Sequence, residues 1–512
     1  MSTFPQPFTS TVSHWQATNR GPDSFFGHNK DKALPSEVID YVVVGAGMAG
    51  ASTAYHLTRE VITPGKTTVV LEAKDVASGA TGRNGGHCAP YSFSALPELT
   101  KPLSEGGGGL SIDDALDVLD LERRVLLWVE ETVHREGWEI DLWKGEKVEV
   151  RLTQTQAQRM DVLYKKWAEA RNKSEKYKDI PLEWSWTWDE KKAQADTRFK
   201  GAVAYSKGPA GSIHPHKLAS AFLRSALKSG QAELYSWAPV QGIQKVDGAA
   251  TVEKQSENGL WEVNLGKRGK LRARNVVICT NAYTPGLLKG TDIERFLTPF
   301  QGQAANVTPP PTYSGSSSLA YTYTSENGTY LISTPHAGIV LGLTSDNAIK
   351  QGVMDKKEIY GNWNDSYVQP AAEKWLGEFC KKNFEGWGEE AVGEGRIRAW
   401  TGIQCATQDT LPLIGSVPLQ QLQDEKKGNE GLYVAAGFQG HGMARIVLST
   451  KYLAEYITTG QWNDGLPSSF IITQERLERG NKAPPYITPG EKIGGVRGWV
   501  VGVVDGVKSV QR

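Results

Sequence analysis

Apolar positions near the start of the chain follow the pattern of a βαβ unit. The apolar run Val38–Val44 is typical of a strand that is buried on both faces of a parallel sheet. A helix is expected from about Gly47 to Glu60, followed by a second strand at Thr67–Leu71. In front of this unit, the polar residues 1–36 carry scattered Pro, Gly and Asn and are expected to form an extended arm.

A long amphipathic helix is predicted over Ile112–Arg135. Its apolar residues recur at helical spacing, at Leu116, Leu119, Val125, Leu126, Val129 and Val133. Ser111 and Asp114 place a capping-box signature at its beginning. Further along, an alternation of tryptophans indicates one face of a strand packed in the core, at Trp184, Trp186 and Trp188.

The second half of the chain predicts two kinds of sheet. A compact apolar strand at Val276–Cys279 continues a strand–helix alternation. Residues 300–400 are rich in Thr, Ser, Tyr and Gly, and their runs Tyr330–Ser333 and Gly338–Leu343 predict an antiparallel sheet in a second domain. Residues 431–460 add a strand, a glycine-rich turn and a long helix.

Composition describes an ordinary globular protein. With 512 residues, the chain is long enough for two domains, and its 57 acidic and 57 basic residues cancel. We therefore expect no nucleic-acid partner and no attraction to an anionic membrane. No run approaches the roughly 20 apolar residues that span a bilayer, and the N-terminus lacks the apolar core of a signal peptide. A cytoplasmic location is expected, and the oligomeric state is left open.

The four cysteines are far apart in the sequence and form no C-x-x-C pair: Cys88, Cys279, Cys380 and Cys405. This spacing argues against a zinc ribbon, an iron–sulfur cluster and a disulfide framework, and it fits a reducing compartment. No metal site is expected.

The first chemical motif is Gly45-x-Gly47-x-x-Gly50, placed between the predicted strand and helix. These glycines permit a tight turn, close approach to a pyrophosphate, and packing of the helix on the strand. The helix N-terminus then offers N–H groups to the phosphates. Glu72 ends the second strand, where a carboxylate accepts hydrogen bonds from a ribose and repels a 2′-phosphate. The pattern predicts dinucleotide binding and disfavours NADP.

Two further glycine-rich segments extend this site. Residues 78–86 (SGATGRNGG) follow the second strand, and their small side chains let the backbone lie against a planar ligand or a diphosphate. Residues 431–442 (GLYVAAGFQGHG) again join a strand to a helix N-terminus. In a flavoprotein, this second turn would aim N–H groups at the N1/C2=O edge of the reduced ring.

In order and spacing, these segments resemble the D-amino-acid oxidase-like flavoprotein superfamily, and within it the glycine oxidase, sarcosine oxidase and γ-glutamylputrescine oxidase group. The resemblance extends from about Val38 to Leu453. It is supported by four shorter landmarks: Gly211–Pro215 (GSIHP), Val276–Thr284 (VVICTNAYT), Pro299–Gln303 (PFQGQ) and Trp400–Gly415.

The resemblance implies an α/β fold: a Rossmann-like FAD-binding domain of glutathione-reductase type, with a discontinuous α+β substrate domain on an antiparallel sheet. We expect the arm at 1–36, the FAD-binding domain at 37–105, 195–298 and 396–475, the substrate domain at 106–194 and 299–395, and a C-terminal tail at 476–512. It also implies oxidation of a C–N bond in a small amine or amino compound by hydride transfer to flavin N5. An imine results, and O₂ reoxidises the flavin with release of H₂O₂.

Candidate cofactor contacts follow from the three loops and from the resemblance. They are Gly45, Ala46, Gly47, Met48, Ala49, Gly50, Glu72, Ala73, Gly79, Thr81, Gly82, Arg83, Asn84, Gly85, Gly86, Val240, Thr280, Asn281, Gly437, Gln439, Gly440, His441, Gly442 and Met443.

The chain departs from the family pattern where the substrate binds. Members that act on amino acids commonly carry Arg in a W-x-G-x-R-P segment, which pairs with the substrate carboxylate. Here Gln404 and Cys405 stand in those places. Because Gln supplies no charge, an amine or a larger, differently anchored compound is favoured over a glycine-like substrate. Arg445 and Arg83 are the candidate partners for a carboxylate.

Two histidines flank the flavin loops and are candidate donors at the flavin edge. The set of candidate catalytic residues is therefore His87, Gln404, His441 and Arg445. FAD is expected to be held non-covalently. The alternative is a covalent link from Cys405 or Cys88 to the flavin 8-methyl group, as some relatives use.

Other functions compete with an amine oxidase. A dehydrogenase or tailoring enzyme of secondary metabolism would use an acceptor other than O₂. A flavin monooxygenase would share the first glycine motif but should carry a G-D-A-A-H-like segment, which is missing, and a disulfide reductase would need a C-x₄-C pair, also missing. A non-enzymatic flavin-bound scaffold is the last alternative.

Overall fold

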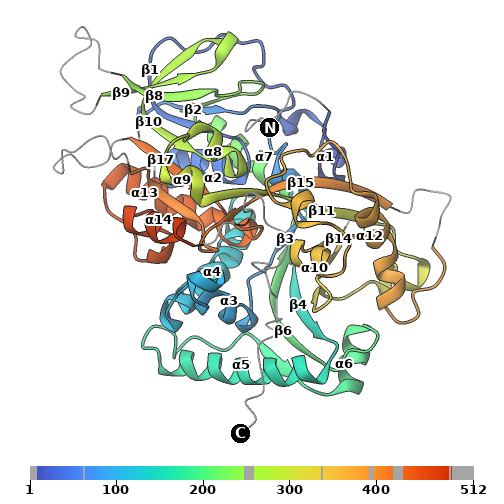
Figure 1. Ribbon diagram of the computed structural model, residues 1–512. Helices are drawn as coiled ribbons and strands as arrows, with labels where there is room; N and C mark the ends of the chain where they lie inside the picture. Colours follow the sequence, from blue (N-terminus) through green and yellow to red (C-terminus); the bar gives the residue numbers. More distant parts are fainter. Residues whose placement is uncertain are drawn as a thin grey trace.

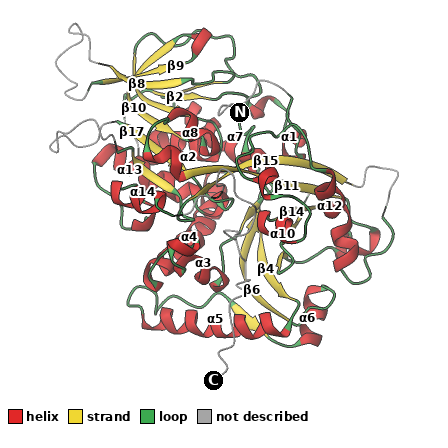
Figure 2. Cartoon of the chain, viewed as in Figure 1, coloured by secondary structure: helices red, strands yellow, loops and turns green. Residues whose placement is uncertain are grey.

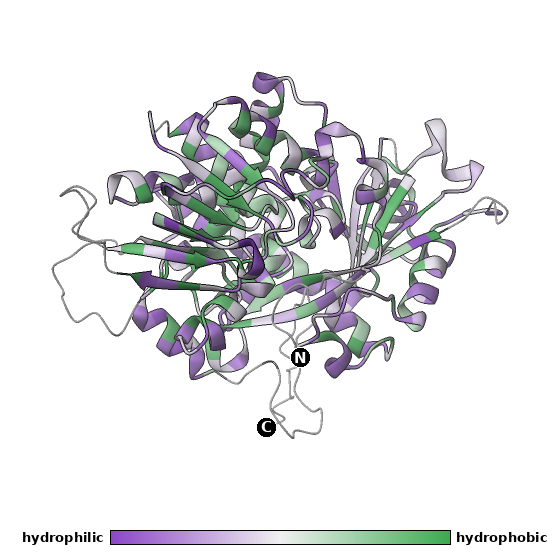
Figure 3. Cartoon of the chain, turned by 90° about the horizontal axis from the view of Figure 1, so that it is seen from above, coloured by the Kyte–Doolittle hydropathy of each residue, from purple (hydrophilic) through white to green (hydrophobic). Residues whose placement is uncertain are grey.

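The computed structural model describes residues 9–61, 64–246, 259–335, 338–390, 397–418 and 431–483, together with Tyr486. Two large sheets organise the chain, with helices packed around and between them (Figures 1 and 2). Hydrophobic positions concentrate in the strands and on inner helix faces, and hydrophilic positions lie toward the periphery (Figure 3).

The first sheet has a parallel centre. Its strands follow the order β16 (Leu413–Ser416), β17 (Leu432–Ala436), β10 (Lys270–Ile278), β1 (Val38–Val44), β2 (Thr68–Leu71) and β7 (Ala232–Tyr235). From β17 to β7 all pairs are parallel, whereas β16 is antiparallel to β17. β9 (Leu260–Asn264) pairs antiparallel with β10 and with β8 (Gly242–Val246).

Side chains of the central strand β1 are buried in the cores on both faces of this sheet. Val43 lies in the core that α2, α4, α7 and α13 share, whereas Val42 and Val44 lie in the core on the opposite face. Each of these side chains is at most 3% exposed. Burial on both faces explains why the strand is apolar at successive positions.

The second sheet is antiparallel except for one pair among its described strands. Its order is β15 (Ile397–Thr407), β11 (Leu297–Val307), β14 (Gly338–Leu343), β13 (Thr329–Thr334), β12 (Thr322–Ser325), β4 (Trp143–Arg151), β6 (Ala204–Ser212) and β3 (His87–Cys88). β12 and β4 are parallel, and β5 (Ser185–Thr187) pairs with β6.

The described α-helices have the following bounds: α1 (His14–Thr18), α2 (Met48–Tyr55), α3 (Leu96–Thr100), α4 (Ile112–Glu136), α5 (Gln154–Lys173), α6 (Glu190–Thr197), α7 (Pro215–Lys228), α8 (Thr284–Leu287), α9 (Asp292–Phe296), α10 (Ser345–Lys350), α11 (Lys356–Ile359), α12 (Pro370–Asn383), α13 (Ile446–Thr459) and α14 (Gln474–Asn481). Among the described helices, none is both long and apolar enough to cross a bilayer.

The fold class is confirmed, and β1, β14 and α4 lie where the sequence predicts them. Three strands of the second sheet, β3, β6 and β15, come from ranges that we expected in the FAD-binding domain. α4, from the expected substrate domain, shares a core with α2 and α13. Strands of the two sheets therefore alternate along the sequence more often than the expected domain ranges do.

The helix predicted from Gly47 to Glu60 is confirmed, and its last turn, His56–Glu60, is π-helical. Two local predictions need correction. The N-terminal segment is not simply extended, because α1 begins at a Ser13 capping box and buries Trp15 to 2% exposure. Trp188 lies beyond β5 and is 45% exposed, so only Trp184 and Trp186 pack into the core. The expected C-terminal tail lies outside the described residues after Ala483, apart from Tyr486.

Candidate active site

A large hollow, the first cavity, lies where parallel strands of the first sheet end. It opens to solvent and takes in about 1460 Å³ of space when its open side is included. Gly45, Glu72 and Cys279, the residues that follow the ends of β1, β2 and β10, line it. The carboxyl ends of the strands are the edge at which open parallel sheets bind ligands.

The turn after β1 has a geometry that requires glycine. Gly45 has a φ of +104°, and a Cβ at Gly50 would lie 1.8 Å from the Gly45 carbonyl oxygen. α2 therefore packs directly on the turn, and its first residue, Met48, lines the cavity. The first-turn N–H groups of a helix lack intrahelical acceptors, so this end of α2 suits a phosphate.

Glu72 forms the polar end of the cavity wall. Its carboxylate accepts the N–H groups of Ala46 at 2.7 Å and Lys74 at 2.9 Å. Burial raises the pKa of Glu72, and these backbone hydrogen bonds oppose the rise. Each carboxylate oxygen has two lone pairs, so Glu72 can also accept a hydrogen bond from a ligand hydroxyl group.

Asn281 connects the end of β10 to the glycine turn after β17. It begins a 3₁₀ turn, Asn281–Tyr283, in the left-handed region with a φ of 43°. Its Oδ1 atom accepts the N–H group of Gly437 at 3.0 Å. This bond holds the two turns together at the same edge of the sheet.

Most of the predicted cofactor contacts line the first cavity: Gly45, Gly47, Met48, Ala49, Glu72, Ala73, Gly79, Thr81, Arg83, Asn84, Val240, Thr280, Asn281, Gly440, Gly442 and Met443. Ala46, Gly50, Gly82, Gly86 and Gly437 support the walls from behind. For example, a Cβ at Gly82 would lie 2.2 Å from the Ala77 carbonyl oxygen, and one at Gly437 would lie 2.3 Å from Thr407.

A second cavity, of about 1200 Å³ when its open side is included, adjoins the first. The residues that line both are Asn84, Gln404, Gly440 and Met443. The Gln404 amide occupies the space beside two glycines, because a Cβ at Gly302 or Gly440 would lie within 2.4 Å of it. Gln404 therefore stands at the junction of the cavities. Gly85, Gln439, His87 and His441 line the second cavity.

His87 lies against the side of the second cavity formed by β13. Its ring packs edge-on against Tyr330, and its Nε2 lies 3.3 Å from the Leu331 carbonyl oxygen. Burial lowers the pKa of His87 to about 3. The imidazole is therefore neutral at neutral pH.

His441 is held by a buried carboxylate that the sequence did not mark as functional. Its Nε2 lies 3.1 Å from Glu122 Oε2, and its ring stacks on Tyr91 at 3.6 Å. Burial lowers the pKa of His441, although Glu122 opposes this shift. A neutral His441 donates its Nε2 proton to the carboxylate, which leaves the Nδ1 lone pair as a proton acceptor.

Glu122 also binds Arg445, which explains why that arginine is not at the substrate. Arg445 Nε donates to Glu122 Oε1 at 2.8 Å, and the side chain is fully buried. Arg445 is not among the described residues that line either cavity. Arg445 therefore shares the Glu122 carboxylate with His441, but it lies outside the cavity that His87, Gln404 and His441 line.

Glu122 has a sequence signal that could have revealed it. It lies three residues after Leu119 and four before Leu126, on the apolar face of α4. Burial alone would raise the pKa of Glu122, but contacts with His441 and Arg445 bring it to about 2. A charged residue within an apolar stripe must find such partners or remain neutral.

The two candidate cysteines for a covalent flavin link point away from the cavities. Cys405 follows Gln404 on β15, so its side chain projects to the opposite face of the strand and joins the core beneath the first sheet. Cys88 is equally buried, and burial raises its pKa to about 12. Neither thiol is among the described residues that line the cavities.

A parallel sheet with a glycine turn at its carboxyl edge, beside a large cavity, is typical of a dinucleotide-binding protein. The family described as FAD dependent oxidoreductase (DAO) matches residues 40–456, and the chain belongs to it. The probable oxidoreductase OrdL of Haemophilus influenzae is 23% identical over 443 residues, which cover 85% of this chain and 87% of that protein.

Solved structures share the fold at lower identity. Glycine oxidase from Geobacillus kaustophilus is 19% identical with a TM-score of 0.60, covering 86% of this chain and 99% of its own. L-amino acid deaminase from Proteus vulgaris is 17% identical with a TM-score of 0.62, covering 91% and 100%. FAD is thus the cofactor of this protein, and the glycine turn and Glu72 of the first cavity fit a flavin dinucleotide.

Replacing Glu122 tests the buried network. We expect Glu122→Gln to lower the free energy of unfolding by about 3–5 kcal/mol at pH 7, because Arg445 loses its buried counter-charge. The folded-state pKa of Glu122 is about 2 against an ordinary 4.5, so its contribution is present above pH 4.5 and is lost as pH falls. The difference between variant and wild type should therefore shrink toward pH 3 in urea unfolding. The control is Glu130→Gln, because Glu130 lies on the same helix as Glu122 but pairs with Lys144 at the surface. It should change the free energy of unfolding by less than about 1 kcal/mol. A difference between Glu122→Gln and wild type that stays constant with pH would contradict the assignment.

Acid precipitation tests how the flavin is held. Because both thiols are buried and turned from the cavities, we expect FAD to be released into the supernatant and the protein pellet to be colourless. Cys405→Ser and Cys88→Ser should bind as much FAD as the wild type. A yellow pellet that either substitution turns colourless would show a thioether instead.

Proposed function

We propose that FAD occupies the first cavity and that the second cavity holds an amino compound whose C–N bond is oxidised. The observation that carries this proposal is the junction at Gln404, where a substrate in one cavity would meet a cofactor in the other. Glycine oxidase and L-amino acid deaminase, which share this fold, are named for reactions of amino compounds.

Bound FAD supplies an acceptor for the two electrons of the substrate C–H bond, which leaves an imine for water to hydrolyse. The chain's own residues position the substrate and manage its protons. An amine must be unprotonated to be oxidised, and the Nδ1 lone pair of neutral His441 is suited to accept the ammonium proton. Glu122 then stabilises the imidazolium, as a buried carboxylate does in a catalytic triad. Gln404 provides a neutral amide at the junction.

Lys147 changes the expectation about the substrate. Among the described residues that line the second cavity, it is the one with a formal charge when both histidines are neutral. Its ammonium donates to the Pro90 carbonyl oxygen at 3.0 Å and lies 3.2 Å from Glu149. An ammonium has three donors, so one remains for a ligand.

The carboxylate that balances the charge of Lys147 is shared with other hydrogen-bond donors. Glu149 also accepts from Arg151 at 3.1 Å and from Ser92 at 2.8 Å, and it is not among the described lining residues. The cavity wall therefore presents the cationic end of this buried cluster. It would attract an anionic group, whereas a simple amine or diamine would find no lining carboxylate among the described residues. We infer that the substrate is an amino compound with an acidic group held at Lys147, and that O₂ reoxidises the flavin.

Anaerobic mixing tests the reaction. A substrate of this class should bleach the visible flavin absorbance of the purified enzyme, and admission of air should restore the colour with release of H₂O₂. An acceptor dye that restores the colour when air does not would assign a dehydrogenase. A flavin that stays oxidised with all amino and N-alkyl amino acids tried would contradict the proposal.

Replacing Lys147 tests the anionic group. We expect Lys147→Met to raise the KM for an acidic substrate by about tenfold to a hundredfold, the value of a charge-assisted hydrogen bond, with a smaller change in kcat. The KM for the same compound as its neutral amide should hardly change. Lys144→Met, on the same strand but in a surface pair with Glu130, is the matched control. Equal losses for acid and amide would show that Lys147 only supports the fold.

A further inference from the structure

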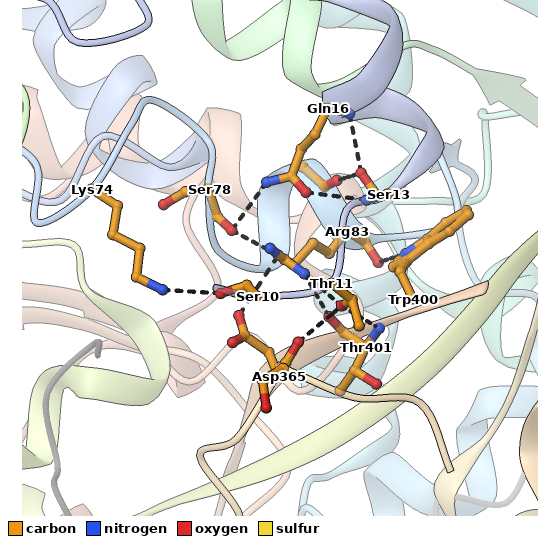
Figure 4. A network of polar contacts seen from close by, with 12 residues as sticks. Ser10, Thr11, Ser13, Gln16, Lys74, Ser78, Arg83, Asp365, Trp400 and Thr401 are labelled. Atoms are coloured by element: carbon orange, nitrogen blue, oxygen red, sulfur yellow. Dashed lines mark hydrogen bonds and ion pairs between the residues drawn. The ribbon is translucent and has the colours of Figure 1, made fainter. Parts of the chain in front are cut away.

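A segment before the family-matched region lies against the wall of the first cavity. The family match begins at residue 40, whereas residues 10–16, here called the N-terminal strap, contact loops from three other parts of the chain (Figure 4). The strap lies within residues 1–36, which were expected to form an extended arm. Its contacts with Arg83, Asp365 and Lys74 are to residues that line the first cavity.

Thr11 is the centre of these contacts. Its N–H group donates to the Asp365 carbonyl oxygen at 2.8 Å. Its hydroxyl oxygen accepts hydrogen bonds from Arg83 Nη1 and from the Thr401 N–H group, each at 3.0 Å. The same hydroxyl donates to the Asp365 carbonyl oxygen at 2.9 Å. The hydroxyl thus joins three segments, and its hydrogen-bonding capacity is filled.

Arg83 depends on this arrangement for its place in the cavity wall. Its side chain is 4% exposed, and its Nε donates to the Ser78 carbonyl oxygen at 2.8 Å. Nη1 divides its bonds between Thr11 and the Thr401 carbonyl oxygen, and the Asp365 carboxylate lies 3.8 Å away. A buried guanidinium is stable only where its donors are satisfied, so loss of Thr11 would favour another position.

Other residues of the strap fasten the glycine-rich loop itself. The Ser13 hydroxyl donates to the Gly82 carbonyl oxygen, and Trp15 Nε1 donates to that of Asn84 at 2.7 Å. A Cβ at Gly86 would lie 2.8 Å from the Trp15 ring, so the loop and the ring are in direct contact. Lys74 Nζ reaches Ser10 Oγ at 3.0 Å.

We propose that the N-terminal strap is a component of the FAD site, in which Thr11 is a positioning residue that holds Arg83 and Asp365 in the cavity wall. FAD retention then depends on residues outside the family-matched region. The strap binds no substrate in this proposal, so it does not depend on the reaction assigned above.

The test measures FAD release from the holoenzyme. Thr11→Val removes the hydroxyl and keeps the side-chain shape, whereas Thr11→Ser keeps the hydroxyl. We expect Thr11→Val to raise the rate of FAD release, followed by flavin fluorescence after dilution, by about tenfold, as expected for a lost hydrogen bond to a charged group. Thr11→Ser should release FAD within about twofold of the wild-type rate.

Thr18→Val is the matched control. Thr18 belongs to the same N-terminal region, but its hydroxyl contacts the His14 carbonyl oxygen and His214, which are not among the described lining residues of the first cavity. It should leave FAD release unchanged even if it lowers the thermal midpoint. Equal FAD release from Thr11→Val and wild type would overturn the proposal, as would release that Thr18→Val accelerates to the same extent. If Thr11→Val does not yield folded holoenzyme, Ser13→Ala, which removes the hydrogen bond from the strap to the Gly82 carbonyl oxygen, provides the same readout: accelerated release supports the proposal and an unchanged rate overturns it.

Discussion

The carboxylate of Glu122 is the constraint on which the wall of the second cavity at His441 depends. It lies in the core at 0% exposure and accepts hydrogen bonds from three donors: the Tyr91 N–H group at 2.7 Å, His441 and Arg445. These donors belong to the segment after the glycine-rich loop and to the turn before α13, while Glu122 itself belongs to α4. A buried charge with one partner missing is strongly destabilising, so the three segments must meet in one geometry. That geometry fixes the ring of His441 against Tyr91 and selects its tautomer.

The alternation of side chains along β15 determines which of two neighbouring residues faces the cavities. Successive side chains of a strand face opposite ways, so Gln404 reaches the junction of the cavities while Cys405 is committed to the core. β15 pairs with β11 over its whole length, from Leu297 opposite Thr407 to Val307 opposite Ile397. A shift of one residue would exchange the two side chains, but it would also expose the core face of the strand. The long register therefore decides which of the two neighbours can approach a flavin.

Features that local backbone geometry requires could be predicted from the sequence, whereas contacts between distant segments could not. Gly45 and Gly50 were recognisable because a tight strand–helix turn leaves no room for a side chain, and this requirement is local. Glu122 carried a weaker signal as a charge on an apolar helix face. Lys147, Glu149 and Arg151 alternate along β4 as they would on a solvent-facing strand, yet all are at most 3% exposed. Thr11 and Asp365 meet across 354 residues, and nothing near either one marks the contact. The partner of Arg445 could not be predicted for the same reason, since Glu122 lies 323 positions away.

The distribution of charge between the two cavities links these observations to chemistry. The absence of arginine at position 404 favoured an amine or a differently anchored amino compound, with Arg445 and Arg83 as the candidate partners for a carboxylate. Burial keeps His87 and His441 neutral, Arg445 is neutralised by Glu122, and Arg83 is turned toward the first cavity with Asp365. Among the described residues that line the second cavity, Lys147 then remains as the cation, on a different strand from Gln404. With the charge on β4 and not on β15, the proposed flavin would have a neutral amide beside it, and the proposed anchor lies beside Tyr91, whose ring stacks on His441. An acidic group at Lys147 and an amine at His441 would hold a substrate at two points on one wall, which orients its C–H bond more firmly than either contact alone.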